Sequence, residues 1–137
     1  MLVDDIENAV RSILEPPLAT LHSYKIRRAV GGGRSHTELL VTCQVDESEL
    51  TRTKVLTVAI SEEHKEIQIP TFFMPTPLRG QKIGFQVLQE ICNIGMQYGY
   101  KLFITDMVEA FHRKMVSLGA YEIDHETVQI TPNTKLA

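Results

Sequence analysis

Tryptophan is absent from this sequence, cysteine occurs only twice in 137 residues, and no long hydrophobic run is present. Cys43 and Cys92 lie far apart and fit no metal-binding or redox spacing, so each is predicted to be a small buried residue of a reducing compartment. No apolar run approaches the roughly 20 residues that a membrane-spanning helix needs. Residues 1–5 are acidic rather than basic, which is not typical of a secretory signal. Together these absences predict a cytoplasmic protein with no membrane partner.

A surplus of positive charge is also absent. The chain has 14 Lys and Arg residues against 17 Asp and Glu residues, which gives a formal net charge of −3. This balance argues against nucleic acid as the main partner. A local basic stretch is interpreted as the solvated face of a strand, with contact to an acidic partner or to phosphates as the alternative. It contains Lys25, Arg27, Arg28 and Arg34.

Hydrophobic periodicity predicts one mixed α+β domain over residues 1–137, with a central, mostly antiparallel sheet flanked by helices. The predicted helices cover residues 3–15, 83–98 and 108–118. The first should end at Pro16 and Pro17, and Gly99 should close the second in a left-handed conformation. The predicted strands cover residues 22–28, 38–45, 53–60, 66–73, 102–105, 121–123 and 127–130. Residues 31–36, rich in glycine, lack the ending of a P-loop and are predicted to be a hairpin connection.

The segment between the fourth predicted strand and the second predicted helix has the composition of an anion-binding site. A strand, a turn rich in proline and glycine, and a helix N-terminus leave backbone N–H groups that favour a phosphate. Gly80 and Gly84 would let a diphosphate approach the backbone closely, and Arg79 or Lys82 could add positive charge. The alternative is an ordinary strand-to-helix turn without a ligand.

The order of these elements and motifs resembles the GNAT superfamily of acetyl-CoA-dependent N-acyltransferases. The phosphate loop of that family is typically Arg/Gln-x-x-Gly-x-Gly/Ala, and residues 79–84 match it except at Lys82, which stands where the family has glycine. Downstream, the family often has Asn-Glu-Ala-x-x-x-x-Tyr-x-x-Leu-Gly-Phe. Residues 108–120 align with that pattern, with Val108 in place of the asparagine and Met115 in place of the tyrosine. The resemblance covers residues 66–130.

The resemblance implies a GNAT-like fold that binds acetyl-CoA and transfers the acetyl group directly to an amine of a small molecule or a protein. It implies that the pantetheine arm lies between splayed fourth and fifth strands, while the diphosphate binds the loop after the fourth strand. The cofactor-binding residues expected on this basis are Phe73, Met74, Arg79, Gly80, Gln81, Lys82, Ile83 and Gly84.

The proposed acyl transfer needs an acid/base residue. Attack by an amine needs a base to remove a proton, and the candidates are His112, Glu66 and Glu109, with a structural or solvated role as the alternative for His112.

The family's tyrosine and asparagine are missing, which suggests a second function, a catalytically inactive GNAT-like domain that binds a protein partner. Exposed sheet edges would allow such association, including a homodimer. The five histidines form no close pair, so no metal is expected.

Overall fold

The computed structural model describes residues 1–30 and 36–136, so most of the predicted glycine-rich connection lies outside the described residues. The helices are α1 (Leu2–Leu18), α2 (Ile83–Gln97) and α3 (Glu109–Ser117), with a short 3-10 helix at Thr76–Leu78. The strands are β1 (Ser23–Val30), β2 (His36–Gln44), β3 (Thr53–Ser61), β4 (Glu66–Phe72), β5 (Lys101–Ile104), β6 (Tyr121–Asp124) and β7 (Thr127–Ile130). The predicted mixed α+β class is confirmed.

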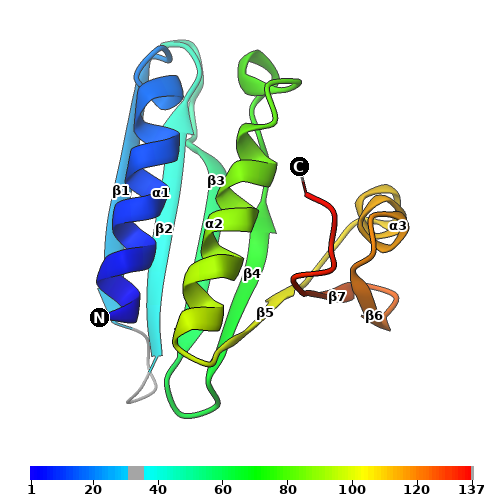
Figure 1. Cartoon of the computed structure of the whole chain (residues 1–137). Helices are drawn as coiled ribbons and strands as arrows, with labels where there is room; N and C mark the ends of the chain where they lie inside the picture. Colours follow the sequence, from blue (N-terminus) through cyan, green and yellow to red (C-terminus); the bar gives the residue numbers. More distant parts are fainter. Residues whose placement is uncertain (31–35, 137) are drawn as a thin grey trace.

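Within the described residues, seven strands form one sheet in the order β1-β2-β3-β4-β5-β7-β6 (Figure 1). Neighbouring strands are antiparallel except β4 and β5, which run parallel. A parallel pair needs a crossover connection, and α2 provides it. In Figure 1, α1 and α2 lie side by side over one face of the sheet, and α3 lies at the β6–β7 end.

The core lies between this helical layer and the sheet. Ile6, Val10 and Leu14 recur at a spacing of four on α1 and are all fully buried. On β2 the predicted alternation holds, because Leu39 and Val41 are buried while their neighbours are partly exposed. None of the helices in the part of the chain that the structure describes is both long and apolar enough to cross a membrane.

The predicted end of the first helix is wrong, because α1 continues through Pro16 and Pro17 to Leu18. Both prolines lie in the last turn, where their missing N–H groups cost only two helical hydrogen bonds. The turn is still closed by the Ala19 N–H, which donates to the Glu15 carbonyl oxygen at 2.8 Å. Leu18 is fully buried, and burial of a leucine side chain contributes about 1.5–3 kcal/mol. That burial offsets the two lost bonds.

Ion pairs fasten α1 to β1. The Arg28 side chain donates from Nε to Glu7 Oε1 at 2.9 Å and from Nη2 to Asp4 Oδ1 at 2.8 Å. Arg11 donates from Nε to Glu7 Oε2 at 2.9 Å and from Nη2 to the Ile26 carbonyl oxygen at 3.0 Å. Hydrogen bonds from Arg11 and Arg28 therefore lower the pKa of the Glu7 carboxyl.

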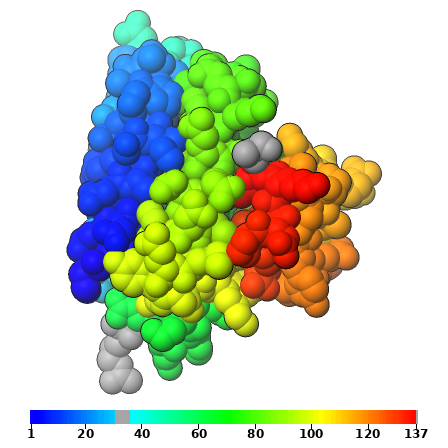
Figure 2. Space-filling view, in the orientation of Figure 1, coloured from blue at the N-terminus to red at the C-terminus, as the bar shows by residue number. Residues whose placement is uncertain are grey.

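The C-terminal residues pack between α2 and the part of the molecule that contains α3 (Figure 2). Figure 2 shows them, in red, between α2 and the region of α3 and β6. The Lys135 N–H donates to the Leu118 carbonyl oxygen at 2.7 Å, and Leu136 is buried. This segment holds the end of α3 in place.

Candidate functional site

The parallel strands β4 and β5 separate before β4 ends. Their pairing runs from Glu66 opposite Lys101 to Ile69 opposite Ile104, and the Thr105 N–H then donates to the Ile69 carbonyl oxygen at 3.1 Å. Beyond that bond, residues 70–72 of β4 have no strand partner on the β5 side within the described residues. Ligands of open sheets bind outside the carboxyl ends of parallel strands. The diverging ends of β4 and β5 are such a place.

A bulge turns the end of β4 toward the helices. Thr57 of β3 pairs with Thr71, whereas Ala59 pairs with Gln68, so β4 carries one extra residue at this point. Because side chains alternate with a period of two, the extra residue moves Phe72 to the helix-covered face of the sheet. There its ring meets α2, since a Cβ placed on Gly84 would lie 2.7 Å from Phe72 Cζ.

The loop from β4 to α2 leaves backbone donors available. Gly80 has φ +80° and Lys82, directly before α2, has φ +61°, so both adopt the left-handed conformation. No protein acceptor is found among the described residues for the N–H groups of residues 80–85, and no side chain caps the helix. The positive end of the α2 dipole adds to these donors. The loop therefore has the local structure that binds an anion.

Two side chains of the loop, those of Arg79 and Gln81, donate hydrogen bonds to carbonyl oxygens of the preceding residues. Arg79 Nε donates to the Met74 carbonyl oxygen at 2.9 Å, and the guanidinium lies 4.9 Å from the Phe73 ring centroid. Gln81 Nε2 donates to the Pro77 carbonyl oxygen at 3.3 Å. All the residues predicted to bind the cofactor thus lie together at one edge of the sheet, where β4 ends and α2 begins.

The three predicted acid/base residues are not brought together. Glu66 begins β4, about 20 Å along the strand from Phe72 at about 3.3 Å per residue. His112 is 7% exposed, and its Nε2 lies 2.7 Å from the Asp124 carbonyl oxygen, so Nε2 carries the hydrogen and donates it. Glu109 begins α3, on the same edge as the loop, with an exposed side chain.

Two residues of this edge are not among the predicted site residues. Phe111 stacks on Phe72 across the opening, with ring centroids 5.6 Å apart and planes 10° from parallel. Asp106, exposed and two residues beyond the end of β5, has φ +55°. A polar residue after a short buried strand is a weak signal for Asp106. For Phe111 there is none, because its partner depends on the bulge in β4.

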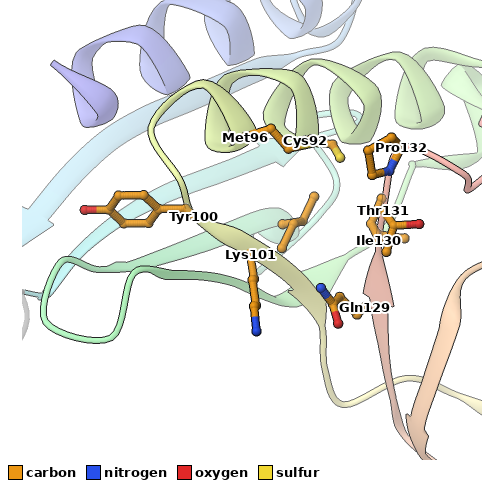
Figure 3. Close-up of a pocket in the computed structure, with 9 residues that line it drawn as sticks. Cys92, Met96, Tyr100, Lys101, Gln129, Ile130, Thr131 and Pro132 are labelled. Carbon is orange, nitrogen blue, oxygen red and sulfur yellow. The ribbon is translucent and has the colours of Figure 1, made fainter.

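The cavities lie elsewhere. One of about 180 Å³, partly open to solvent, lies between α2 and the β5–β7 pair, where Cys92, Met96 and Ile130 form part of an apolar wall (Figure 3). Burial raises the pKa of the Cys92 thiol, which makes it a poor nucleophile. A second, more open cavity is lined by residues around Gly119 and Tyr121. Neither is lined by residues 79–84.

No family model matches the chain, and no curated protein matches it significantly. Across residues 1–30 and 36–136, no three His, Cys, Asp or Glu side chains are grouped so that they could hold a metal ion. The interpretation therefore rests on the edge formed by β4, α2, β5 and α3.

Proposed function

We propose that this protein has a GNAT-like fold, binds acetyl-CoA or another acyl-CoA, and transfers the acyl group to an amine. One observation carries the proposal. The parallel pair β4–β5 separates after Ile69 and Ile104, and the loop that resembles the phosphate loop, residues 79–84, follows at the same edge. The strand order supports it, because the separating parallel pair is formed by the fourth and fifth strands, as the resemblance implies.

The residues at this edge suit the parts of an acyl-CoA. The diphosphate would accept hydrogen bonds from the N–H groups of residues 80–85, with the charges of Arg79 and Lys82 nearby. The pantetheine arm, which carries amides, would lie along residues 70–72, the part of β4 without a partner on the β5 side in the described chain. When bound, the acyl-CoA supplies the thioester that an amine attacks.

Carboxylates at the edge formed by β4, α2, β5 and α3 are the groups that we propose for proton transfer. Among the predicted acid/base residues, Glu109 alone begins its helix beside the opening, so we assign it the removal of the amine's proton. Asp106 lies on the same edge as a second carboxylate. No acid is required for the thiolate, because an ordinary thiol pKa of about 8.5 already makes it a good leaving group. His112 acts as a structural residue, since its Nε2 anchors α3 to β6.

One observation favours the inactive, partner-binding domain as a second candidate. Met115, which aligns with the family's tyrosine, is fully buried. The Met115 side chain belongs to the hydrophobic core, and its thioether cannot donate a proton. The acid that assists thiolate departure in the family therefore has no counterpart here.

Calorimetric titration with acetyl-CoA, with desulfo-CoA as a ligand control, tests the first candidate. Replacement Arg79→Ala removes a charge and its brace against Phe73, and should weaken acetyl-CoA binding about 10- to 100-fold. The matched control is Arg113→Ala, an exposed arginine of α3 whose recorded ion pair is long, at 3.9 Å. It should bind like wild type. No binding by wild type at millimolar acetyl-CoA would contradict the proposal and favour the inactive domain.

A further inference from the structure

The opening between β4 and β5 is spanned by two aromatic rings. Phe72, the last residue of β4, stacks on Phe111 in the first turn of α3. The same Phe72 ring lies against Gly84 in the first turn of α2, where a Cβ would come within 2.7 Å of it. The stack therefore connects β4, α2 and α3 across the place where a pantetheine arm would enter.

A second contact joins the same two helices. Lys114, three residues after Phe111 and on the same side of α3, places its Nζ 5.1 Å from the Phe85 ring centroid on α2. Phe85 and Phe111 are partly buried and pack against the core, and Lys114 is exposed. Separation of the Phe72 and Phe111 rings therefore costs the energy of one aromatic pair together with the apolar surface that it exposes.

We propose that Phe72 and Phe111 form a gate over the acyl-CoA site, which must separate before the arm can lie between the diverging strand ends. This inference rests on the proposed function and adds a control of access to it. The gate acts on the arm alone, because Arg79, Gly80 and Lys82 of the phosphate loop are exposed outside the stack. A single aromatic stack corresponds to about a 3- to 10-fold change in an equilibrium constant. The gate lowers the apparent affinity by that factor.

The test compares acetyl-CoA with 3′-phosphoadenosine diphosphate, the nucleotide half of CoA, which has no arm. In Phe111→Ala the stack is gone while residues 79–84 are unchanged. The affinity for acetyl-CoA should rise about 3- to 10-fold, and the affinity for the nucleotide half should stay the same. Phe103→Ala is the matched control, because it removes another half-buried ring from β5, where Phe103 pairs with Gln129 and Gln68. It should change neither affinity.

A second variant guards against unfolding. Phe111→Leu keeps most of the buried volume and loses the planar stack, so it should give a smaller rise in the same direction. Equal acetyl-CoA affinities of wild type and both Phe111 variants would overturn the gate and leave the proposed function standing. A rise shared by the Phe103 control would also overturn it, as a sign of general loosening. If neither ligand binds any variant, the proposed function fails and the gate fails with it.

Discussion

α1 and α2 lie side by side on the same face of the sheet, but different kinds of contact hold them there (Figure 1). Charged groups at the start of α1 are matched by Arg28 of β1, and Arg11 reaches the Ile26 carbonyl oxygen. At the start of α2, no side chain caps the helix, and Gly84 packs directly on Phe72. Neither helix start has a side-chain cap, but Asp4 and Asp5 lie in the first turn of α1, whereas the first turn of α2 has no acidic residue.

This difference separates structural polar groups from groups that can bind a ligand. Arg28, in the basic stretch of β1, donates its hydrogen bonds to Glu7 and Asp4 of α1. Its guanidinium is therefore already paired within the protein. A donor without an internal partner must find water or a ligand instead. The start of α2 has several such donors, together with two residues in the left-handed conformation, Gly80 and Lys82. The absence of an acidic residue from the first turn of α2 supports the proposed anion site there, since a carboxylate at a helix start would compete with a bound anion.

The largest effect is expected from Gly84→Asp. The new Cβ would lie 2.7 Å from Phe72 Cζ, and the carboxylate would compete with the diphosphate for the N–H groups at the start of α2. Acetyl-CoA binding should become undetectable, and the free energy of unfolding in urea should fall by about 2–4 kcal/mol. Gln86→Asp, exposed on the same helix, adds the same charge without the steric conflict and should retain both binding and stability. Normal acetyl-CoA binding by Gly84→Asp would show that the ligand does not use this helix start.

A smaller effect should follow from loss of the α1 contacts. Glu7→Gln removes the charge that Arg11 and Arg28 share, and should lower the free energy of unfolding at pH 7 and low salt by about 1 kcal/mol. The pKa of Glu7 is lowered in the folded protein from 4.5, so the folded state binds this proton less readily than the unfolded state. The stabilisation is therefore complete above about pH 4.5 and is lost as the pH falls through the lower folded-state pKa.

Urea unfolding between pH 3 and pH 7 measures this dependence, with Glu63→Gln as the control. Glu63 is exposed, and no ion pair is recorded for it among the described side chains. Wild type and the control should lose stability as the pH falls, while Glu7→Gln should lose less over the same interval. Parallel curves for all three proteins would show that the α1 contacts contribute nothing to the pH dependence.

Periodicity predicted most of the fold because each helix and strand buries one face. The alternation of Leu39 and Val41 gave the buried face of β2, and Gly99 closes α2 with φ +79°, as predicted. The loop at residues 79–84 was also predictable, since the chemistry of a helix start is local. These features depend on neighbours in the sequence.

The remaining features depend on contacts between distant segments. The bulge that turns Phe72 toward α2 is defined by how β4 pairs with β3. The sequence of β4 alone therefore does not predict it. From the sequence, His112 is a candidate base with a structural or solvated role as the alternative, and only the fold places the Asp124 carbonyl oxygen 2.7 Å from its Nε2. Pro17 was expected to end α1, and the burial of Leu18 carries the helix past it. The end of α1 is thus a local preference that packing overrides.

The smallest effect sharpens the comparison at the start of α2. Lys82 occupies a left-handed conformation, φ +61°, at the position where the resemblance has glycine. Any residue with a Cβ is strained there, so Lys82→Gly should raise the free energy of unfolding by about 0.5–1 kcal/mol. Gln81→Gly is the matched control, because Gln81 is exposed and is not among the residues with positive φ. Glycine there only adds freedom to the unfolded chain and should lower stability slightly. If Lys82→Gly were instead the less stable of the two in urea, the Lys82 side chain would have to make a stabilising contact that outweighs its backbone strain.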